Sequence, residues 1–306
     1  LAGIGMTVER DEYDECNSVR LILNGTVEKL PYYTIAGEQM FLPEEFYITY
    51  YTLEWDKDNA DFKKVQIEEK ATDSNRLSVQ APTCDTEFML TDKYLKEWGM
   101  EPSVRSEEYI SVTPICGAIV EQHTRDYKNE WDREQPSDGS FGGSAPVDMT
   151  FKAYYNDVVT HSDWQFSKDK DFNVIDAHYY NADDFQYTFN QEGTTYVRLM
   201  VSTGTCQDST EVYTITVGES RLEAPNIFSP GTTPGVNDEW KVAYKSIVSF
   251  KCWIFNRWGV QMFHFEDPAI GWDGKYKGKW VDPGVYFYVI EAKGADGKSH
   301  NLKGHI

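Results

Sequence analysis

The segment FKCWIFNRWGVQMFHF (Phe250–Phe265) decides the fold expected for the C-terminal part of this sequence. Its first half alternates, so Phe250, Cys252 and Ile254 share one face of an extended strand and other side chains share the opposite face. The tripeptide RWG at 257–259 separates this run from a second alternating run, VQMFHF (Val260–Phe265). The segment therefore predicts a β-hairpin with one buried face.

Three further turn signals follow the hairpin. They are Asp-Gly at 273–274, Lys-Gly at 277–278 and Pro-Gly at 283–284, the last of which precedes a run of β-branched and aromatic residues. So many turns in a short span leave little room for a helix. The pattern predicts a small antiparallel β-sandwich.

Five segments of this region also carry a family resemblance. They are PNIFSPG (Pro225–Gly231), VNDEW (Val236–Trp240), FKCWIFNRWG (Phe250–Gly259), GWDGKYKG (Gly271–Gly278) and PGVYFYVI (Pro283–Ile290). In this order and at this spacing they resemble the gliding-motility-associated C-terminal domain, the type B sorting domain of the Bacteroidetes type IX secretion system. The resemblance implies a β-sandwich that serves as an export signal.

The resemblance also implies a route and a partner. Such a chain enters the periplasm behind a signal peptide and crosses the outer membrane through the type IX machinery. A dedicated outer-membrane β-barrel of the PorP/SprF family is then the expected direct partner, with the cargo held at the cell surface. The sequence opens at Leu1 without signal-peptide features, as expected after removal of a leader. It stops at KGHI (Lys303–Ile306), where the family usually has one more apolar strand, so we expect an incomplete terminus.

Length and composition favour three small β-domains. The 306 residues suit two or three domains of roughly 100–150 residues, and 15% aromatic content without long Leu/Ala repeats favours strands. We expect an all-β fold of three consecutive immunoglobulin-like β-sandwich domains at 1–125, 146–218 and 222–306, with a short helix in the first. The linker GESRLEA (Gly218–Ala224) is too short for free swinging, which predicts a semi-rigid rod.

The first domain resembles no family that we identify. Its run TDKYLKEWGM (Thr91–Met100) predicts the short helix, because Thr91 can cap the start and Gly99 can end it. Its strand-like runs are broken by Gly, Pro, Asn and Asp clusters. These runs are RLILNG (Arg20–Gly25), EEFYITYYTLEW (Glu44–Trp55), KKVQIEEK (Lys63–Lys70), RLSVQAP (Arg76–Pro82) and EYISVTP (Glu108–Pro114).

The second domain resembles a polycystic-kidney-disease-type immunoglobulin-like (PKD-like) domain. The resemblance is carried by YTF at 187–189, GTTYVRLMV at 193–201 and ITV at 215–217. The family's WDFGDG loop reads WQFSKD (Trp164–Asp169) here, so that loop need not be built alike. The polar stretch at 124–145 before this domain predicts a boundary or an exposed loop, with an acidic recognition loop as the alternative.

Charge is unevenly divided along the chain. The net charge is −21, yet residues 221–306 hold 11 Lys and Arg against 9 Asp and Glu, a balance of +2. Residues 1–220 therefore carry −23. Such an acidic field repels nucleic acid and anionic lipid headgroups and acts foremost as a solubilising surface. A dedicated cation-binding face is the alternative, and no apolar run reaches the length of roughly 20 residues needed for a membrane span.

The five cysteines allow at most two disulfides. Cys252 lies on the inward face of a predicted strand and is expected to stay a buried thiol. The other four, Cys16, Cys84, Cys116 and Cys206, are disulfide candidates in an oxidising compartment, and their three possible pairings stay open.

Motifs for catalysis and metal binding are missing from the sequence. It contains no G-x-S-x-G, H-E-x-x-H or P-loop pattern, and its six histidines are scattered. DKDNAD (Asp56–Asp61) begins like an EF-hand loop but lacks the required glycine. We therefore expect no enzyme, no cofactor and no metal.

The exposed parts of the family motifs are the expected partner-binding surface. Arg257 is the preferred polar anchor, because its guanidinium can bridge two acceptors, and a structural bond to a loop carbonyl is its alternative role. Trp253, Trp258, Trp272 and Trp280 also raise the alternative of a carbohydrate platform, but Trp258 and Trp272 fall where the family motif has tryptophan, which favours a role as core or turn anchors for these two. The expected partner-binding residues are Asn256, Arg257, Trp258, Gly259, Trp272, Asp273, Gly274, Pro283 and Gly284.

Together these features predict a non-catalytic protein of the cell surface, exported by the type IX system and associated with the outer membrane. A surface subunit or tether of the secretion or gliding machinery is the favoured role. A glycan-binding or adhesive protein carried by the same system is the alternative.

Overall fold

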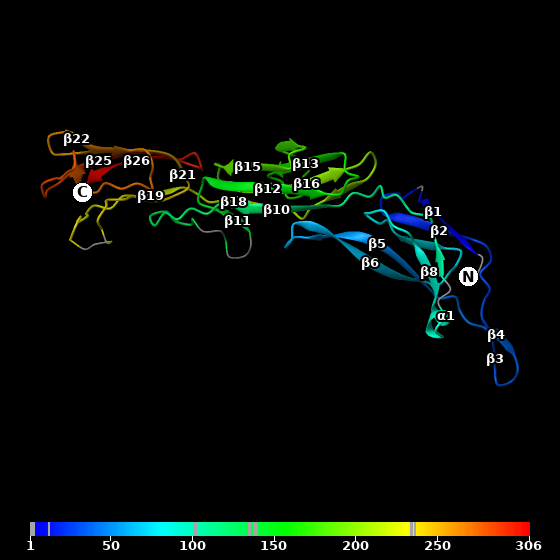
Figure 1. Cartoon of the computed structure of the whole chain (residues 1–306). Coiled ribbons are helices and arrows are strands. Elements are labelled where there is room, and N and C mark those ends of the chain that lie inside the picture. The colour runs from blue at the N-terminus through cyan, green and yellow to red at the C-terminus, as the bar shows by residue number, and fades with distance from the viewer. Residues whose placement is uncertain are drawn as a thin grey trace.

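The computed structural model of the chain describes residues 4–11, 13–100, 103–133, 136, 140–232, 235 and 237–306. Within these residues, strands make up nearly all of the regular structure and build three β-sandwiches in a row (Figure 1). Each sandwich encloses its own cluster of buried apolar side chains. The predicted all-β, immunoglobulin-like fold is therefore confirmed.

The first sandwich packs the sheet β1-β2-β7 against the sheet β6-β5-β8-β9. Val19 and Leu21 of the first sheet share one core with Ile48 and Leu90 of the second. A separate two-stranded sheet, β3-β4, projects from this domain at the N-terminal end of the molecule (Figure 1). The strands are β1 (Gly5–Arg10), β2 (Ser18–Asn24), β3 (Pro31–Tyr33), β4 (Gln39–Phe41), β5 (Phe46–Asp56), β6 (Asp61–Ala71), β7 (Leu77–Gln80), β8 (Met89–Asp92) and β9 (Ser103–Arg105).

Two local features of this domain differ from expectation. The short helix exists as α1 (Lys93–Glu97), but Asp92 rather than Thr91 caps it, with Asp92 Oδ1 accepting the Leu95 N–H at 3.0 Å. Thr91 is instead a residue of β8. The expected strand at Glu108–Pro114 is wrong, because only Tyr109 of this run forms a bridge, with Thr86.

The second sandwich packs β10-β12-β15 against β11-β18-β16-β13-β14. Phe151, Trp164 and Leu199 are fully buried at its centre. β10 was expected within the first domain, yet it pairs with β12 along its whole length and so belongs to this sheet. The strands are β10 (Cys116–Gln122), β11 (Phe141–Gly143), β12 (Val147–Tyr155), β13 (His161–Ser167), β14 (Ala177–Tyr180), β15 (Asp184–Phe189), β16 (Gly193–Ser202), β17 (Gln207–Ser209) and β18 (Tyr213–Val217).

The third sandwich is built on the four-stranded sheet β22-β21-β25-β26. The predicted hairpin is present: β21 pairs with β22, and Phe250, Cys252 and Ile254 are all buried. Trp240 and Trp272 close the core from the other side, joined by a backbone bridge. The strands are β19 (Arg221–Glu223), β20 (Ala243–Lys245), β21 (Ile247–Phe255), β22 (Gln261–Phe265), β23 (Lys275–Tyr276), β24 (Lys279–Trp280), β25 (Phe287–Gly294) and β26 (Ser299–His305).

A disulfide bond joins the first and second sandwiches. Cys16, which precedes β2, is bonded to Cys206, which precedes β17, across 190 positions of sequence. Cys84 and Cys116, the other two candidates, are free thiols, and so is the buried Cys252. The Asn156 side chain of the second sandwich also donates hydrogen bonds to the carbonyls of Thr83, at 2.7 Å, and Thr113, at 3.0 Å.

The polar stretch 124–145 lies at the junction of the second and third sandwiches, which we call the second joint. It does not lie between the first two domains, at the first joint. It connects β10 to β12, and its described residues reach the third sandwich, where the Trp131 N–H donates to the Tyr244 carbonyl at 2.7 Å. Asn129 Nδ2 donates to two carbonyls of the same sandwich, those of Val242 and Pro268. Residues 134, 135 and 137–139 lie outside the described residues. The described part of the stretch therefore ties two domains together.

Candidate partner-binding groove

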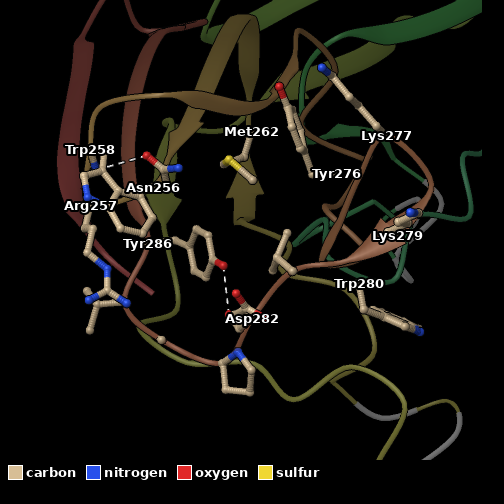
Figure 2. A pocket seen from close by; sticks show the side chains of 14 residues that line it. Asn256, Arg257, Trp258, Met262, Tyr276, Lys277, Lys279, Trp280, Asp282 and Tyr286 are labelled. Carbon is tan, nitrogen blue, oxygen red and sulfur yellow. Dashed lines mark hydrogen bonds between the residues drawn. The ribbon is translucent and has the colours of Figure 1, made fainter.

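A groove of about 460 Å³ opens at one end of the third sandwich. One wall is the turn that follows β21, together with the segment 282–286, and the other wall is the hairpin β23–β24 (Figure 2). Met262 and Tyr286 lie between the walls and are only partly buried. β21 leads away from the joint over about 27 Å, at 3.4 Å per residue, so the groove lies at the far end of the domain.

Asn256 shapes the first wall. Its side-chain Oδ1 accepts hydrogen bonds from the backbone N–H groups of Trp258 and Val260, both at 3.0 Å. Gly259 completes the turn with a φ of 78°, in the left-handed region that glycine adopts without strain. Asn256 and Gly259 therefore set the shape of this wall.

Arg257 and Trp258 are the exposed part of that turn. Trp258 is 75% exposed, and the Arg257 guanidinium carbon lies 4.9 Å from the centre of its ring. Within the described part of the chain, Arg257 makes no hydrogen bond and no ion pair. The structural bond to a loop carbonyl that the sequence left open is therefore absent there, and the guanidinium donors face the solvent.

Pro283 and Gly284 border the same groove beside Arg257. Both are exposed, and a Cβ on Gly284 would lie 3.9 Å from Arg257 Nη2. Tyr286 fixes this segment, because its hydroxyl donates to the Asp282 carbonyl at 2.8 Å (Figure 2). Burial raises the pKa of Tyr286, so this phenol remains a donor at neutral pH.

Trp272, Asp273 and Gly274 do not line the groove, and the expectation that Trp272 is exposed is wrong. Its side chain is fully buried, and its Nε1 donates to the Lys275 carbonyl at 3.0 Å. Asp273 accepts from the Lys275 backbone and ammonium, which lower the pKa of this carboxyl. Gly274 is buried near Phe228. These three residues hold the base of the β23–β24 hairpin.

The second wall was not among the expected partner-binding residues. It consists of Tyr276, Lys277, Lys279 and Trp280, of which Trp280 is 58% exposed. The sequence held a signal for it, because Lys277-Gly278 was identified as a turn, and a turn places its flanking side chains at a surface. The four tryptophans do not form one platform, since Trp272 is buried beneath the surface.

The groove has the chemistry of a binding surface. Its walls combine aromatic rings with three cationic side chains, Arg257, Lys277 and Lys279, and one carboxylate, Asp282. Elsewhere in the described chain, no group of three or more His, Cys, Asp or Glu side chains is placed to hold a metal ion. No helix among the described residues has the length and hydropathy to cross a bilayer.

Comparison with known families assigns two of the three domains. Residues 222–306, which include the whole groove, match the CHU_C type IX secretion signal domain. The C-terminal domain belongs to this family. The secretion signal domain thus confirms the resemblance carried by the five C-terminal segments. Residues 7–106 match the Fn3_FA fibronectin type III domain, which gives the first sandwich a family that sequence motifs had not.

The remaining comparisons find only remote similarity. No curated protein matches the chain. A crystal structure of a tetra-tandem repeat in the extending region of a large adhesion protein is 11% identical, with a TM-score of 0.22, covering 99% of this chain and 74% of that one. Dimeric latent PorU from Porphyromonas gingivalis is 11% identical, with a TM-score of 0.20 and coverages of 99% and 33%. Domains from titin are 9% identical, with a TM-score of 0.23 and coverages of 94% and 91%.

The secretion signal domain marks the chain as cargo of the type IX secretion system, exported to the cell surface or outer membrane. The immunoglobulin-like, fibronectin-type and secretion signal domains are all non-catalytic types.

Proposed function

We propose that this protein is a non-catalytic surface subunit or tether of the secretion or gliding machinery, held at the outer membrane by a β-barrel of the PorP/SprF family. The secretion signal domain binds the barrel through the groove, and the first two sandwiches extend away from it. In this arrangement, export and anchoring both depend on one end of the elongated molecule.

The observation that carries this proposal is the meeting of family-motif residues at one groove. Arg257 and Trp258 come from one family segment and Pro283 and Gly284 from another, yet all four are exposed and border the same hollow. A folding role alone does not require exposed aromatic and cationic side chains. Such residues at a concave surface are the usual anchors of a protein interface.

The groove also faces away from the rest of the chain. The turn between β21 and β22, which lines the groove, lies at the end of the secretion signal domain away from the second sandwich (Figure 1). A membrane partner can therefore reach it without displacing either of the other domains.

The test is export and co-purification of the Arg257→Ala and Trp258→Ala variants. Loss of an interface anchor costs about 2 kcal/mol or more, which lowers barrel co-purification by about thirtyfold. Arg76→Ala is the matched control, because Arg76 is exposed on the first sandwich. Normal surface display and normal barrel recovery for both groove variants would contradict the proposal.

A second candidate function, adhesion, is favoured by the β3–β4 hairpin. Tyr33 is 69% exposed, Phe41 is 54% exposed and Ile35 at the turn is fully exposed, although all three are apolar or aromatic. Contiguous exposed apolar side chains mark interaction surfaces. Binding to a glycan array or to host-cell surfaces that is lost in Tyr33→Ser and Ile35→Ser variants would support adhesion.

A further inference from the structure

The hairpin β23–β24, which we term the basic hairpin (residues 275–280), has the sequence KYKGKW. Lys275 is paired with Asp273 at 2.8 Å and lies 4.5 Å from the Trp280 ring centre. Lys277 and Lys279 are exposed, and neither forms an ion pair with any residue that the structure describes. The hairpin therefore presents two uncompensated ammonium groups.

The backbone places both lysines at or beside a tight turn. Lys277 and Gly278 have φ values of 51° and 79°, which make the tight turn between the two strands. The Lys277 ammonium lies 5.1 Å from the Tyr276 ring centre. Across the groove, Arg257 adds a third cation without a partner in the described chain (Figure 2). Three cations and one carboxylate, Asp282, thus line one opening.

Exposed apolar side chains accompany these cations. Trp258 is 75% exposed, Trp280 58%, Val285 53% and Val260 47%. Tryptophan beside lysine or arginine is the pairing that proteins use where water meets lipid, because the ring enters the headgroup layer while the ammonium binds lipid phosphate. A site for a soluble anion needs no such apolar rim.

The distribution of charge orients the molecule toward an anionic surface. Residues 1–220 carry −23 and residues 221–306 carry +2, so an anionic membrane repels the front of the chain and attracts only its end. At an ionic strength of 0.1 M, screening by salt limits the distance over which a charge acts on the membrane to about 10 Å. The acidic domains lie farther away than that when the groove end faces the membrane, because β21 alone leads back over about 27 Å.

We propose that the basic hairpin docks on a lipid surface that bears phosphate groups, beside the barrel. The inference rests on the proposed function only in placing the groove end against the outer membrane, and it adds lipid as a second partner of the same end. Lys277 and Lys279 bind lipid phosphates and Trp280 enters the headgroup layer, while Arg257 and Trp258 on the other wall remain available to the barrel. The contact fixes the orientation of the molecule at the membrane.

The test is flotation of the purified full chain with vesicles, with no barrel present. Vesicles of phosphatidylcholine alone are compared with vesicles of phosphatidylcholine mixed with phosphatidylglycerol or with lipid A. Each lysine near an anionic surface contributes about fivefold to partitioning, so Lys277→Ala/Lys279→Ala lowers it about 25-fold. Lys168→Ala/Lys170→Ala is the matched control, since it removes two exposed lysines with the same spacing from the second sandwich.

The aromatic contribution is tested in the same assay. Trp280→Ala lowers vesicle binding severalfold, whereas Trp98→Ala, at a tryptophan 59% exposed on the first sandwich, leaves it unchanged. Binding also weakens as salt rises. Equal binding to neutral and anionic vesicles, or unchanged binding of the double-lysine variant, overturns the inference. Either failure leaves barrel co-purification untouched, so the two proposals are separable.

Discussion

Gly117 lies directly against the indole ring of Trp55, so that a Cβ atom on residue 117 would come within 2.0 Å of Trp55 Cδ2. Gly117 belongs to β10 of the second sandwich and Trp55 to β5 of the first. The Tyr154 ring packs on the same indole, at 5.1 Å between centres. This contact is the apolar part of the first joint, and only glycine leaves room for it.

We predict that Gly117→Ala destabilises the chain by about 1–3 kcal/mol, because the added methyl group displaces the Trp55 ring. Gly204→Ala is the control, since a Cβ there meets no atom within 4 Å. Thermal unfolding followed by tryptophan fluorescence measures the difference. Equal melting temperatures for the two variants would show that the joint is not packed as described.

The disulfide is the covalent part of the same joint. Replacing both cysteines, in Cys16→Ser/Cys206→Ser, is expected to cost about 2–5 kcal/mol, because the unfolded chain gains freedom when a long loop opens. Reducing agent should lower the melting temperature of the native chain and leave that of the variant unchanged. Cys84→Ser serves as the control, because Cys84 is a free thiol outside the fully buried cores. An equal melting temperature of the native chain with and without reductant would contradict this prediction.

Arg125 neutralises a buried carboxylate at the second joint. Its Nη2 donates to Glu130 Oε1 at 2.6 Å, and Glu130 is only 2% exposed. Arg125→Ala leaves that charge unpaired and should cost about 3–5 kcal/mol in urea unfolding. Arg105→Ala is the control, since its carboxylate partner, Glu87, is 54% exposed and such pairs contribute little.

A second variant separates charge from packing at this position. Adding Glu130→Gln to Arg125→Ala removes the unpaired charge and should recover part of the lost stability. A double variant as unstable as Arg125→Ala alone would show that packing, rather than the buried charge, sets the cost.

Asp296 gives the linker between the second and third sandwiches a dependence on pH. Burial alone would raise the pKa of Asp296, but hydrogen bonds from Ser220 and Lys298 hold it well below its usual value. A carboxyl with a lowered pKa stabilises the fold above the unfolded-state pKa of about 3.9, and this contribution is lost as pH falls below it.

We predict that Asp296→Asn lowers stability by about 2 kcal/mol at neutral pH, as for a lost charged hydrogen bond. The difference from the native chain should shrink below about pH 4, where Asp296 takes up a proton in the unfolded chain but stays ionised in the folded one. Urea midpoints across a pH series measure it, with Asp267→Asn as an exposed control. A difference that stays constant down to pH 2 would refute the assignment.

The parts of the fold that the sequence predicted were those set by short-range alternation. Phe250, Cys252 and Ile254 are buried as their spacing required, because a strand with one covered face leaves no other arrangement. The run at Glu108–Pro114 is also rich in aromatic and β-branched residues. It forms no strand, because only Tyr109 pairs with another segment, at Thr86. Strand propensity shows that a segment suits a β-sheet, but a strand forms only where another segment lies beside it to pair with.

The groove was half predictable for a related reason. Turn residues such as Trp258 and Pro283 were correctly placed at the surface, since glycine and proline mark turns locally. Trp272 was wrongly placed there, because burial at a turn depends on what packs over it from elsewhere in the chain, here Phe228 and Tyr286. The pairing of Cys16 with Cys206 is likewise a property of how two domains meet, which spacing along the chain does not encode.

The bond between Cys16 and Cys206 also decides how the molecule carries mechanical load. When the two ends are pulled apart, the force enters at the N-terminus, crosses from residue 16 to residue 206 through sulfur, and continues into the secretion signal domain. The 190 positions between these cysteines are bypassed, so about 650 Å of chain, at roughly 3.4 Å per residue, cannot be drawn out. A cut by a protease within that loop likewise leaves the two pieces covalently joined.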